Sequence, residues 1–157
     1  MISDTAVRLA GIFQKKKITL SLAESCTGGM ISSFITDIPG ASEFFLGGAV
    51  TYSNASKERL LNVPRNILEA HGAVSKETAE AMALGCKELF SSDVAASATG
   101  IAGPGGGTPS KPVGTVFIAV TDGRTVKSER LELKGTRDEI RTAAAENVIR
   151  LIIGFTG

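Results

Sequence analysis

The chain has 157 residues, with 17 Lys and Arg against 16 Asp and Glu, a net charge of +1, seven Phe, one Tyr and no Trp. This length suits a single domain, expected over residues 1–157. The near-neutral charge and the few aromatic residues give no support to nucleic-acid binding. No apolar run approaches the roughly 20 residues of a membrane span, so no membrane partner is expected.

The two cysteines, Cys26 and Cys86, have no metal-ligand spacing. Because no secretory signal is recognisable, we expect both to be free thiols in a reducing cytoplasm. No metal or other cofactor is expected on this basis.

Helical and strand patterns alternate along the chain. In order, they predict a helix over residues 3–13, a strand over 18–23, a helix over 27–36, a strand over 44–53, helices over 55–62, from 64 and over 75–90, strands over 93–99, 113–121 and 125–133, and a helix over 136–153. Asp122-Gly123 is a strong hairpin signal, so the last two strands are expected to be antiparallel. The fold predicted is an α/β protein, a three-layer α/β/α sandwich with a mixed, mostly parallel sheet.

The chain is organised around residues 20–29, where an apolar strand runs into small hydroxyl residues and then two glycines. Ser25 lies at this junction. Small residues let a substrate approach the backbone, and the free N–H groups that open a helix attract a phosphate or a developing oxyanion. The alternative is that Ser25 or Thr27 only caps the following helix, which is the commoner role for a hydroxyl at such a position.

A second glycine-rich stretch, residues 100–112, follows another predicted strand. Loops of this length inside a compact domain are more often functional than idle. Neither glycine cluster fits the phosphate loop G-x-x-x-x-G-K-[ST], and Thr108 stands where the dinucleotide motif G-x-G-x-x-G needs its last glycine. ATP and NAD therefore lose support as ligands.

A nucleophilic Ser25 needs a base. The only histidine, His71, precedes Gly72 at a predicted helix end, where a capping role explains it. Lys57 is the alternative base, because the first turn of a helix disfavours its charged form, and Tyr52 is near enough in sequence to join a proton relay. An ordinary solvated lysine is the competing interpretation. Cys26 is a rival nucleophile, and Glu24 could orient a base.

Five segments together resemble the CinA C-terminal domain family over about residues 6–153. They are residues 23–29 (AESCTGG), 50–54 (VTYSN) with Lys57, 71–75 (HGAVS), 99–104 (TGIAGP) and 111–116 (KPVGTV). The resemblance implies a stand-alone domain of this family. It also implies a nicotinamide mononucleotide deamidase, which hydrolyses the carboxamide to nicotinic acid mononucleotide and ammonia in pyridine nucleotide recycling.

The resemblance implies that Ser25 is the nucleophile and that Lys57 and Tyr52 are its catalytic partners. The substrate-binding residues expected from it and from the loops are Cys26, Thr27, Gly28, Gly29, Gly100, Ile101, Ala102, Gly103, Gly105 and Arg141, the last as a donor to the 5′-phosphate. A homo-oligomer, a dimer or larger, is expected.

Two other functions stay open at this stage. One is a nucleotide-binding or regulatory domain without catalysis. The other is a phosphoryl-transfer enzyme, which would need a divalent metal and is disfavoured by the lack of clustered carboxylates.

Overall fold

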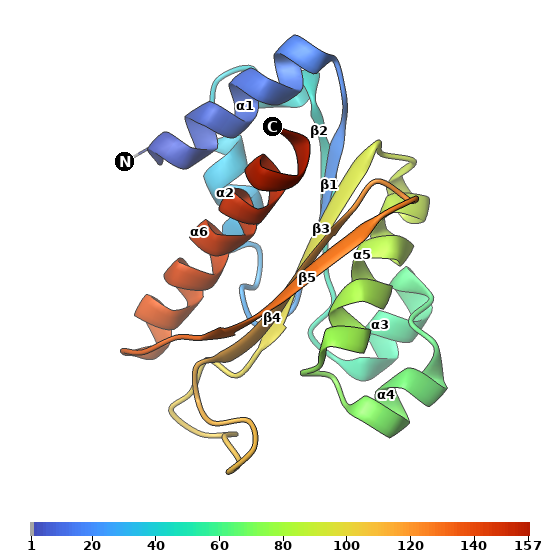
Figure 1. Ribbon diagram of the computed structural model, residues 1–157, viewed down its shortest axis with the longest axis vertical. Coiled ribbons are helices and arrows are strands. Elements are labelled where there is room, and N and C mark those ends of the chain that lie inside the picture. The colour runs from blue at the N-terminus through green and yellow to red at the C-terminus, as the bar shows by residue number, and fades with distance from the viewer. Residues whose placement is uncertain (1) are drawn as a thin grey trace.

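The computed structural model describes residues 2–157, which form one five-stranded sheet with helices on both faces (Figure 1). The strand order is β2-β1-β3-β4-β5. The strands are β1 (Leu20–Glu24), β2 (Phe45–Val50), β3 (Val94–Gly100), β4 (Thr115–Thr121) and β5 (Val126–Glu132).

The sheet is mixed, as predicted. β1 pairs in parallel with β2 and β3, whereas β4 pairs antiparallel with β3 and β5. Four strands therefore run in one direction and β4 runs against them. The turn between β4 and β5 confirms the hairpin signal, because the Asp122 carboxylate accepts hydrogen bonds from the N–H groups of Arg124 and Thr125.

The helices form the outer two layers of an α/β/α sandwich (Figure 1). Three helices cover one face of the sheet, namely α1 (Asp4–Lys16), α2 (Met30–Thr36) and α6 (Arg137–Thr156). The other face carries α3 (Asn54–Leu61), α4 (Arg65–His71) and α5 (Lys76–Phe90), and a short 3-10 helix, η1 (Ala41–Glu43), precedes β2. The predicted three-layer architecture is confirmed.

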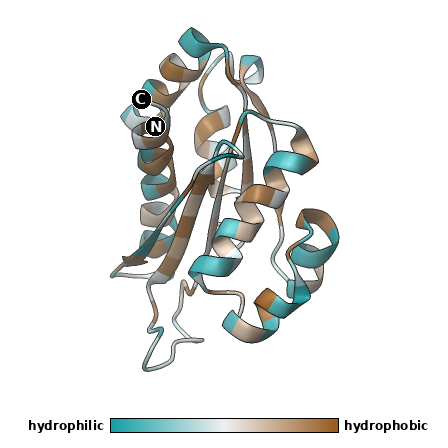
Figure 2. Ribbon diagram, turned by 45° about the vertical axis from the view of Figure 1, so that its right-hand side comes forward, coloured by the Kyte–Doolittle hydropathy of each residue, from teal (hydrophilic) through white to brown (hydrophobic). Residues whose placement is uncertain are grey.

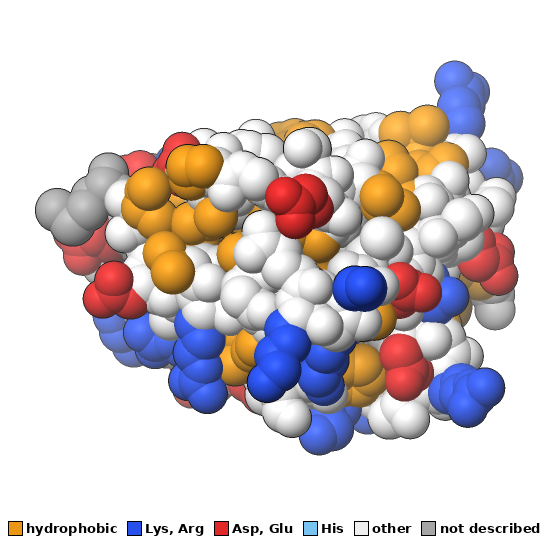
Figure 3. Space-filling model, turned by 90° about the horizontal axis from the view of Figure 1, so that it is seen from above, with side chains coloured by type: hydrophobic (Ala, Val, Ile, Leu, Met, Phe, Trp, Pro, Cys, Tyr) orange, Lys and Arg blue, Asp and Glu red, His pale blue; other side chains and the backbone are white. Residues whose placement is uncertain are grey.

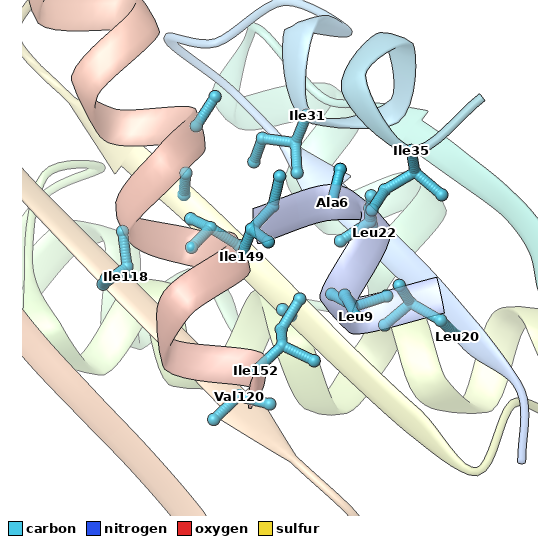
Figure 4. Close-up of a cluster of buried hydrophobic side chains, with 14 of the residues drawn as sticks. Ala6, Leu9, Leu20, Leu22, Ile31, Ile35, Ile118, Val120, Ile149 and Ile152 are labelled. Atoms are coloured by element: carbon cyan, nitrogen blue, oxygen red, sulfur yellow. The ribbon is translucent and has the colours of Figure 1, made fainter. Parts of the chain in front are cut away.

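The largest core cluster lies between the sheet and α1, α2 and α6. Figure 4 shows side chains of three helices and two strands meeting there, among them Ala6, Leu9, Leu20, Leu22, Ile31, Ile35, Ile118, Val120, Ile149 and Ile152. β1 and β3 are buried on both faces, so they consist almost wholly of apolar or small residues. Figure 2 shows the same division, with apolar residues concentrated on the central strands and polar residues on the outer helix surfaces.

The two ends of the sheet differ in character. Figure 3 views the end where β1 begins, and there Lys and Arg side chains gather along one margin beside acidic and hydrophobic ones. Lys15, Lys16 and Lys17, at the end of α1, are exposed. The opposite end, where β1, β2 and β3 finish, carries the two glycine-rich segments. Within residues 2–157, no helix has the length and apolar character needed to cross a membrane.

Several predicted boundaries are wrong; for example, α1 ends at Lys16 and not at residue 13, and α6 ends at Thr156 and not at residue 153. Two others concern the segments that follow β1 and β2. α2 begins at Met30 and not at residue 27, because Gly28 and Gly29 have φ of +56° and +101° and form a turn that helix geometry excludes. β2 ends at Val50 and not at residue 53. The chain then leaves the sheet and Ser53 caps α3, its Oγ accepting the N–H of Ser56 at 3.1 Å.

Candidate active site

Segments far apart in the sequence meet where the parallel strands end. They are the turn after β1, the segment that leads from β2 into α3, the long loop after β3, and the first turn of α6; the turn and the loop lie at the lower end of the sheet in Figure 1. A cavity of about 290 Å³ lies between them. Its lining residues are Ser25, Cys26, Tyr52, Lys57, Ala73, Val74, Thr99, Gly100, Ile101, Ala102, Gly103, Gly105, Gly106 and Arg137. Ligands of α/β sheets bind at such strand ends.

Ser25 is held rigidly at the edge of this cavity. It follows β1 directly, and its N–H donates to the carbonyl of Ala98 in β3 at 3.0 Å, so the sheet pairing continues one residue beyond the strand. Only 8% of its surface is exposed. The hydroxyl is therefore presented by the sheet and not by a flexible loop.

Lys57 is the direct partner of that hydroxyl. Its Nζ lies 3.1 Å from Oγ of Ser25 and donates to the carbonyl of Thr51 at 2.7 Å. The side chain is 1% exposed. This burial contradicts the competing interpretation of an ordinary solvated lysine. Among the described residues, no carboxylate forms a salt bridge with Lys57.

Burial lowers the pKa of Lys57 below the usual 10.5, because few water molecules remain to solvate its charged form. A neutral amine has two N–H groups and one lone pair. One N–H can donate to Thr51 while the lone pair faces the Ser25 hydroxyl. This is the arrangement of a nucleophile with its general base.

Cys26 lies beside Ser25 and lines the cavity, but it is a poor nucleophile. Burial raises the pKa of its thiol to about 11, more than the nearby Arg141 charge lowers it. A thiol with that pKa stays protonated near neutral pH, and the protonated form is unreactive. Between the two candidate nucleophiles, the raised thiol pKa and the Ser25–Lys57 contact favour Ser25.

Glu24 has a structural role. Its carboxylate is fully buried and accepts hydrogen bonds from the N–H groups of Gly29, Ile31 and Ser32 at 2.9 to 3.1 Å, and from the Ser32 hydroxyl at 2.7 Å. It therefore occupies the N-terminus of α2, where a negative charge is stabilised. Neither Ser25 nor Thr27 caps this helix, and the suggestion that Glu24 orients a base is wrong.

Tyr52 and Arg137 lie together at the mouth of the cavity. Tyr52 is 63% exposed, and its hydroxyl accepts a hydrogen bond from Nη2 of Arg137 at 3.1 Å. Nη1 of Arg137 donates to the carbonyl of Gly103 at 2.7 Å. Tyr52 has no hydrogen bond to Ser25 or Lys57. The structure therefore shows no direct contact through which Tyr52 would relay a proton to either residue.

Four predicted substrate contacts lie outside the cavity lining. Thr27, Gly28 and Gly29 form the turn behind Ser25, and Arg141 fastens that turn to α6. Its Nε donates to the carbonyl of Cys26 and its Nη2 to the carbonyl of Thr27, both at 3.0 Å. The prediction gave Arg141 a contact with the substrate's phosphate, whereas in the structure its guanidinium binds two backbone carbonyls.

The long loop after β3 supplies the other wall. The predicted residues Gly100, Ile101, Ala102, Gly103 and Gly105 all line the cavity. Gly100 is required by packing, because a Cβ there would lie 2.8 Å from the carbonyl oxygen of Thr115. Lys111 ties the far end of the loop to the carbonyls of His71 and Val74 at 3.2 and 2.5 Å.

His71 does not line the cavity. It ends α4, and its Nδ1 is 3.7 Å from a carboxylate oxygen of Glu77. Cys86 is buried, and its thiol contacts the Ser21 hydroxyl. Among residues 2–157, no three His, Cys, Asp or Glu side chains are grouped so as to hold a metal ion.

The sequence analysis did not identify Arg137, which lines the cavity. It stands one helical turn before Arg141, and residues four apart share a helix face. The only available signal was its position as the first residue after Thr136, the N-cap of α6. Such a residue lies at the end of the helix nearest the preceding loop.

The fold and the cavity define an α/β protein with a buried serine and lysine in contact where its parallel strands end. The chain matches the family model of the CinA C-terminal domain over residues 3–155 and belongs to that family.

Curated relatives match most of this chain over a part of their own length. CinA-like proteins of Citrifermentans bemidjiense and Geobacter sulfurreducens are 53% and 54% identical over 135 and 144 residues, which cover 86% and 90% of this chain. The same matches cover 33% and 34% of the relatives. The chain thus spans about a third of the length of these proteins.

Solved structures agree with the fold along nearly the whole chain. The competence/damage inducible protein CihA of Agrobacterium tumefaciens has a TM-score of 0.97 at 35% identity and covers 100% of this chain and 99% of its own. A CinA superfamily protein of Escherichia coli has a TM-score of 0.94 at 28% identity, with 99% and 90% covered.

Proposed function

We propose that this chain is an amidohydrolase that converts nicotinamide mononucleotide to nicotinic acid mononucleotide and ammonia, in the recycling of pyridine nucleotides in the cytoplasm. The observation that carries the proposal is the 3.1 Å contact between Ser25 Oγ and the buried Nζ of Lys57 at the edge of the cavity. The substrate is the one that the resemblance to the CinA C-terminal domain family implies.

In the first half of the reaction, neutral Lys57 takes the proton of the Ser25 hydroxyl while Oγ bonds to the carboxamide carbon. The carbonyl oxygen becomes an oxyanion, which backbone N–H groups after Ser25 stabilise. The C–N bond then breaks, and ammonia leaves with the proton that Lys57 returns. The product of this half is an ester between Ser25 and the nicotinoyl group.

In the second half, water replaces ammonia. Lys57 takes a proton from a water molecule as its oxygen bonds to the acyl carbon, and the bond from that carbon to Oγ breaks. Ser25 recovers its proton from Lys57 and nicotinic acid mononucleotide is released. One lysine serves as base and acid in both halves, so the chemistry requires no metal.

Arg137 is the candidate for the substrate's 5′-phosphate. Its guanidinium lies at the cavity mouth, and a planar guanidinium is well suited to bind phosphate oxygens. The loop adds backbone donors beside it, because the N–H groups of Ala102, Gly103, Gly105 and Gly106 have no acceptor among the described residues. Together they support binding of a phosphorylated nucleotide.

The test is ammonia release from nicotinamide mononucleotide by the purified protein, with and without a chelator. We expect release that the chelator does not affect and that Ser25→Ala and Lys57→Met both abolish. Matched controls are Ser42→Ala and Lys15→Met, which change exposed residues far from the cavity. Full activity in Ser25→Ala would refute the proposed chemistry.

Saturable binding of the mononucleotide with no ammonia release by the unmodified protein would support the alternative, a binding or regulatory domain. The buried contact between Lys57 and Ser25 argues against that alternative, because a lysine without a counter-charge is costly to bury and binding alone does not need it.

A further inference from the structure

We propose that Lys111 is a positioning residue, which fixes residues 71–74 as the cavity wall that receives the aromatic ring of the acyl group. This inference rests on the proposed acyl transfer at Ser25. Lys111 and residues 71–74 belong to two of the motif segments of the sequence, and the contact between Ser25 and Lys57 gives neither segment a role.

The first step is the position of the wall. Ala73 and Val74, in the connection between α4 and α5, line the same cavity as Ser25. Both are apolar, and neither side chain has a hydrogen-bonding group. Thr99 fastens this segment to β3, because its Oγ1 donates to the carbonyl of Ala73 at 2.8 Å. The preceding residue of β3, Ala98, accepts the N–H of Ser25, so one strand holds both the wall and the nucleophile.

The second step is how the wall is held. Side chains bind all four consecutive carbonyls of residues 71–74, through five hydrogen bonds of 2.5 to 3.2 Å. The pairs are Lys111 with His71 and Val74, Ser75 and Thr78 with Gly72, and Thr99 with Ala73. Among these donors, only Lys111 binds two carbonyls, and it joins the two ends of the segment. Lys111 therefore fixes the end at Val74, which no other of these side chains holds.

The third step is that Lys111 is itself fixed. Its N–H donates to Oγ1 of Thr108 at 3.0 Å, and its carbonyl accepts the N–H of Thr108 at 2.9 Å. The carbonyl of Ser110 accepts a hydrogen bond from Nη2 of Arg130, in β5, at 2.8 Å. The base of the lysine side chain is thus tied to the sheet, so its ammonium can set the place of residues 71–74.

The fourth step separates this role from a phosphate contact. Lys111 does not line the cavity, and its Nζ already donates to two carbonyls. Without Lys111 the ends of the segment are released, while Thr99 still holds Ala73. The wall then shifts and does not unfold. A misplacement of about 1 Å can cost about 100-fold in rate, and we expect about 10-fold here because the middle of the segment stays bound.

The test uses two variants of Lys111 and a matched control. Lys111→Met keeps the length of the side chain and removes its donors, whereas Lys111→Arg keeps donors of similar reach. Lys127→Met is the control, because Lys127 is exposed on β5, does not line the cavity and has no hydrogen bond from its side chain among the described residues.

The first readout is the labelling of Ser25 by pyridine-3-sulfonyl fluoride and by methanesulfonyl fluoride, located by peptide mass spectrometry. In both reactions Oγ bonds to sulfur, the bond from sulfur to fluorine breaks, fluoride leaves, and Lys57 takes the proton. One reagent carries the ring and the other only a methyl group. The ratio of their second-order rates therefore reports on the wall that receives the ring, without the natural substrate.

We expect the ratio of ring to methyl labelling to fall about 10-fold in Lys111→Met and to recover in Lys111→Arg. The methyl rate should stay near that of the unmodified protein, since a general loss of folding would lower both rates equally. Thr99→Val, which releases the Ala73 carbonyl and leaves Lys111 in place, should lower the same ratio and tests the wall independently if Lys111→Met does not fold.

The second readout is kcat/KM for nicotinamide mononucleotide and for nicotinamide riboside, which lacks the phosphate. Both substrates carry the ring, so we expect Lys111→Met to lower both values by the same factor. Lys127→Met should leave both values unchanged.

Three results would overturn the inference. They are an unchanged labelling ratio in Lys111→Met or in Thr99→Val, an equal loss of both labelling rates, and a loss of activity confined to the phosphorylated substrate. A labelling ratio that falls as expected in a protein that releases no ammonia refutes the substrate proposed above and supports the role of Lys111. A Ser25 that neither reagent labels refutes both proposals.

Discussion

Replacing Glu24 by Gln tests whether a buried carboxylate holds the turn that presents Ser25. Oε1 of Glu24 accepts the N–H groups of Gly29 and Ile31, and Oε2 accepts the N–H and hydroxyl of Ser32. A glutamine amide has only one oxygen. In its better orientation the amide NH2 faces Ser32, whose hydroxyl can turn to accept, but the Ser32 N–H then loses its acceptor.

One buried N–H without an acceptor costs about 1–3 kcal/mol. The lost negative charge at the N-terminus of α2 costs about 0.3–1 kcal/mol more. We therefore expect Glu24→Gln to lower the free energy of unfolding by about 1–4 kcal/mol, with Tm falling about 2–4 °C for each kcal/mol in a domain of this size.

Urea unfolding followed by circular dichroism measures this difference. Glu88→Gln is the control, because Glu88 is exposed and its side chain has no hydrogen bond among the described residues. A change in Glu24→Gln no larger than that in the control would refute the assigned role of Glu24. The account also expects Glu24→Gln to release ammonia more slowly, since the turn carries the nucleophile.

Three further predictions concern the cavity. Because burial lowers the pKa of Lys57 and the neutral amine is the base, kcat/KM should rise as pH passes that pKa from below, with a midpoint under 10.5; a flat pH profile would contradict this. Arg137→Ala should raise KM for nicotinamide mononucleotide by about 10-fold or more and leave nicotinamide riboside unaffected, whereas equal effects on both would exclude a phosphate contact. Cys26→Ala should keep kcat within a few-fold, because a thiol with a pKa of about 11 is not the nucleophile; loss of ammonia release would reverse that assignment.

The architecture was largely readable from the sequence because its signals are local. Alternating strands and helices predicted the layers, and Asp122-Gly123 predicted the antiparallel pair. The small residues of β3 suit the central position that this strand takes between β1 and β4. The strand order was not predictable, since short apolar runs do not specify their neighbours.

The site was harder to predict because it depends on side-chain direction. The sequence singled out Ser25 and Lys57, and the fold brings their side chains together across 32 positions. It named Arg141 and not Arg137. The two arginines are one turn apart on the same helix face, and nothing local shows which one reaches the cavity. The fold decides, because the start of α6 meets the long loop and its second turn meets the Ser25 turn.

The start of α2 also could not be predicted from the local sequence. The prediction began this helix at residue 27, although glycine is a poor helix former. In the structure both glycines adopt positive φ, and Glu24 from the preceding strand satisfies the helix N-terminus. A helix capped by a carboxylate five to eight residues earlier lies outside the usual capping patterns.

The most direct test of the central claim is rapid-quench mass spectrometry of the protein during turnover of nicotinamide mononucleotide. The account predicts a transient adduct on the peptide that contains Ser25, with the mass of the substrate less ammonia, and no adduct in Ser25→Ala. Ammonia release that continues in Ser25→Ala without any adduct would contradict a serine nucleophile activated by Lys57.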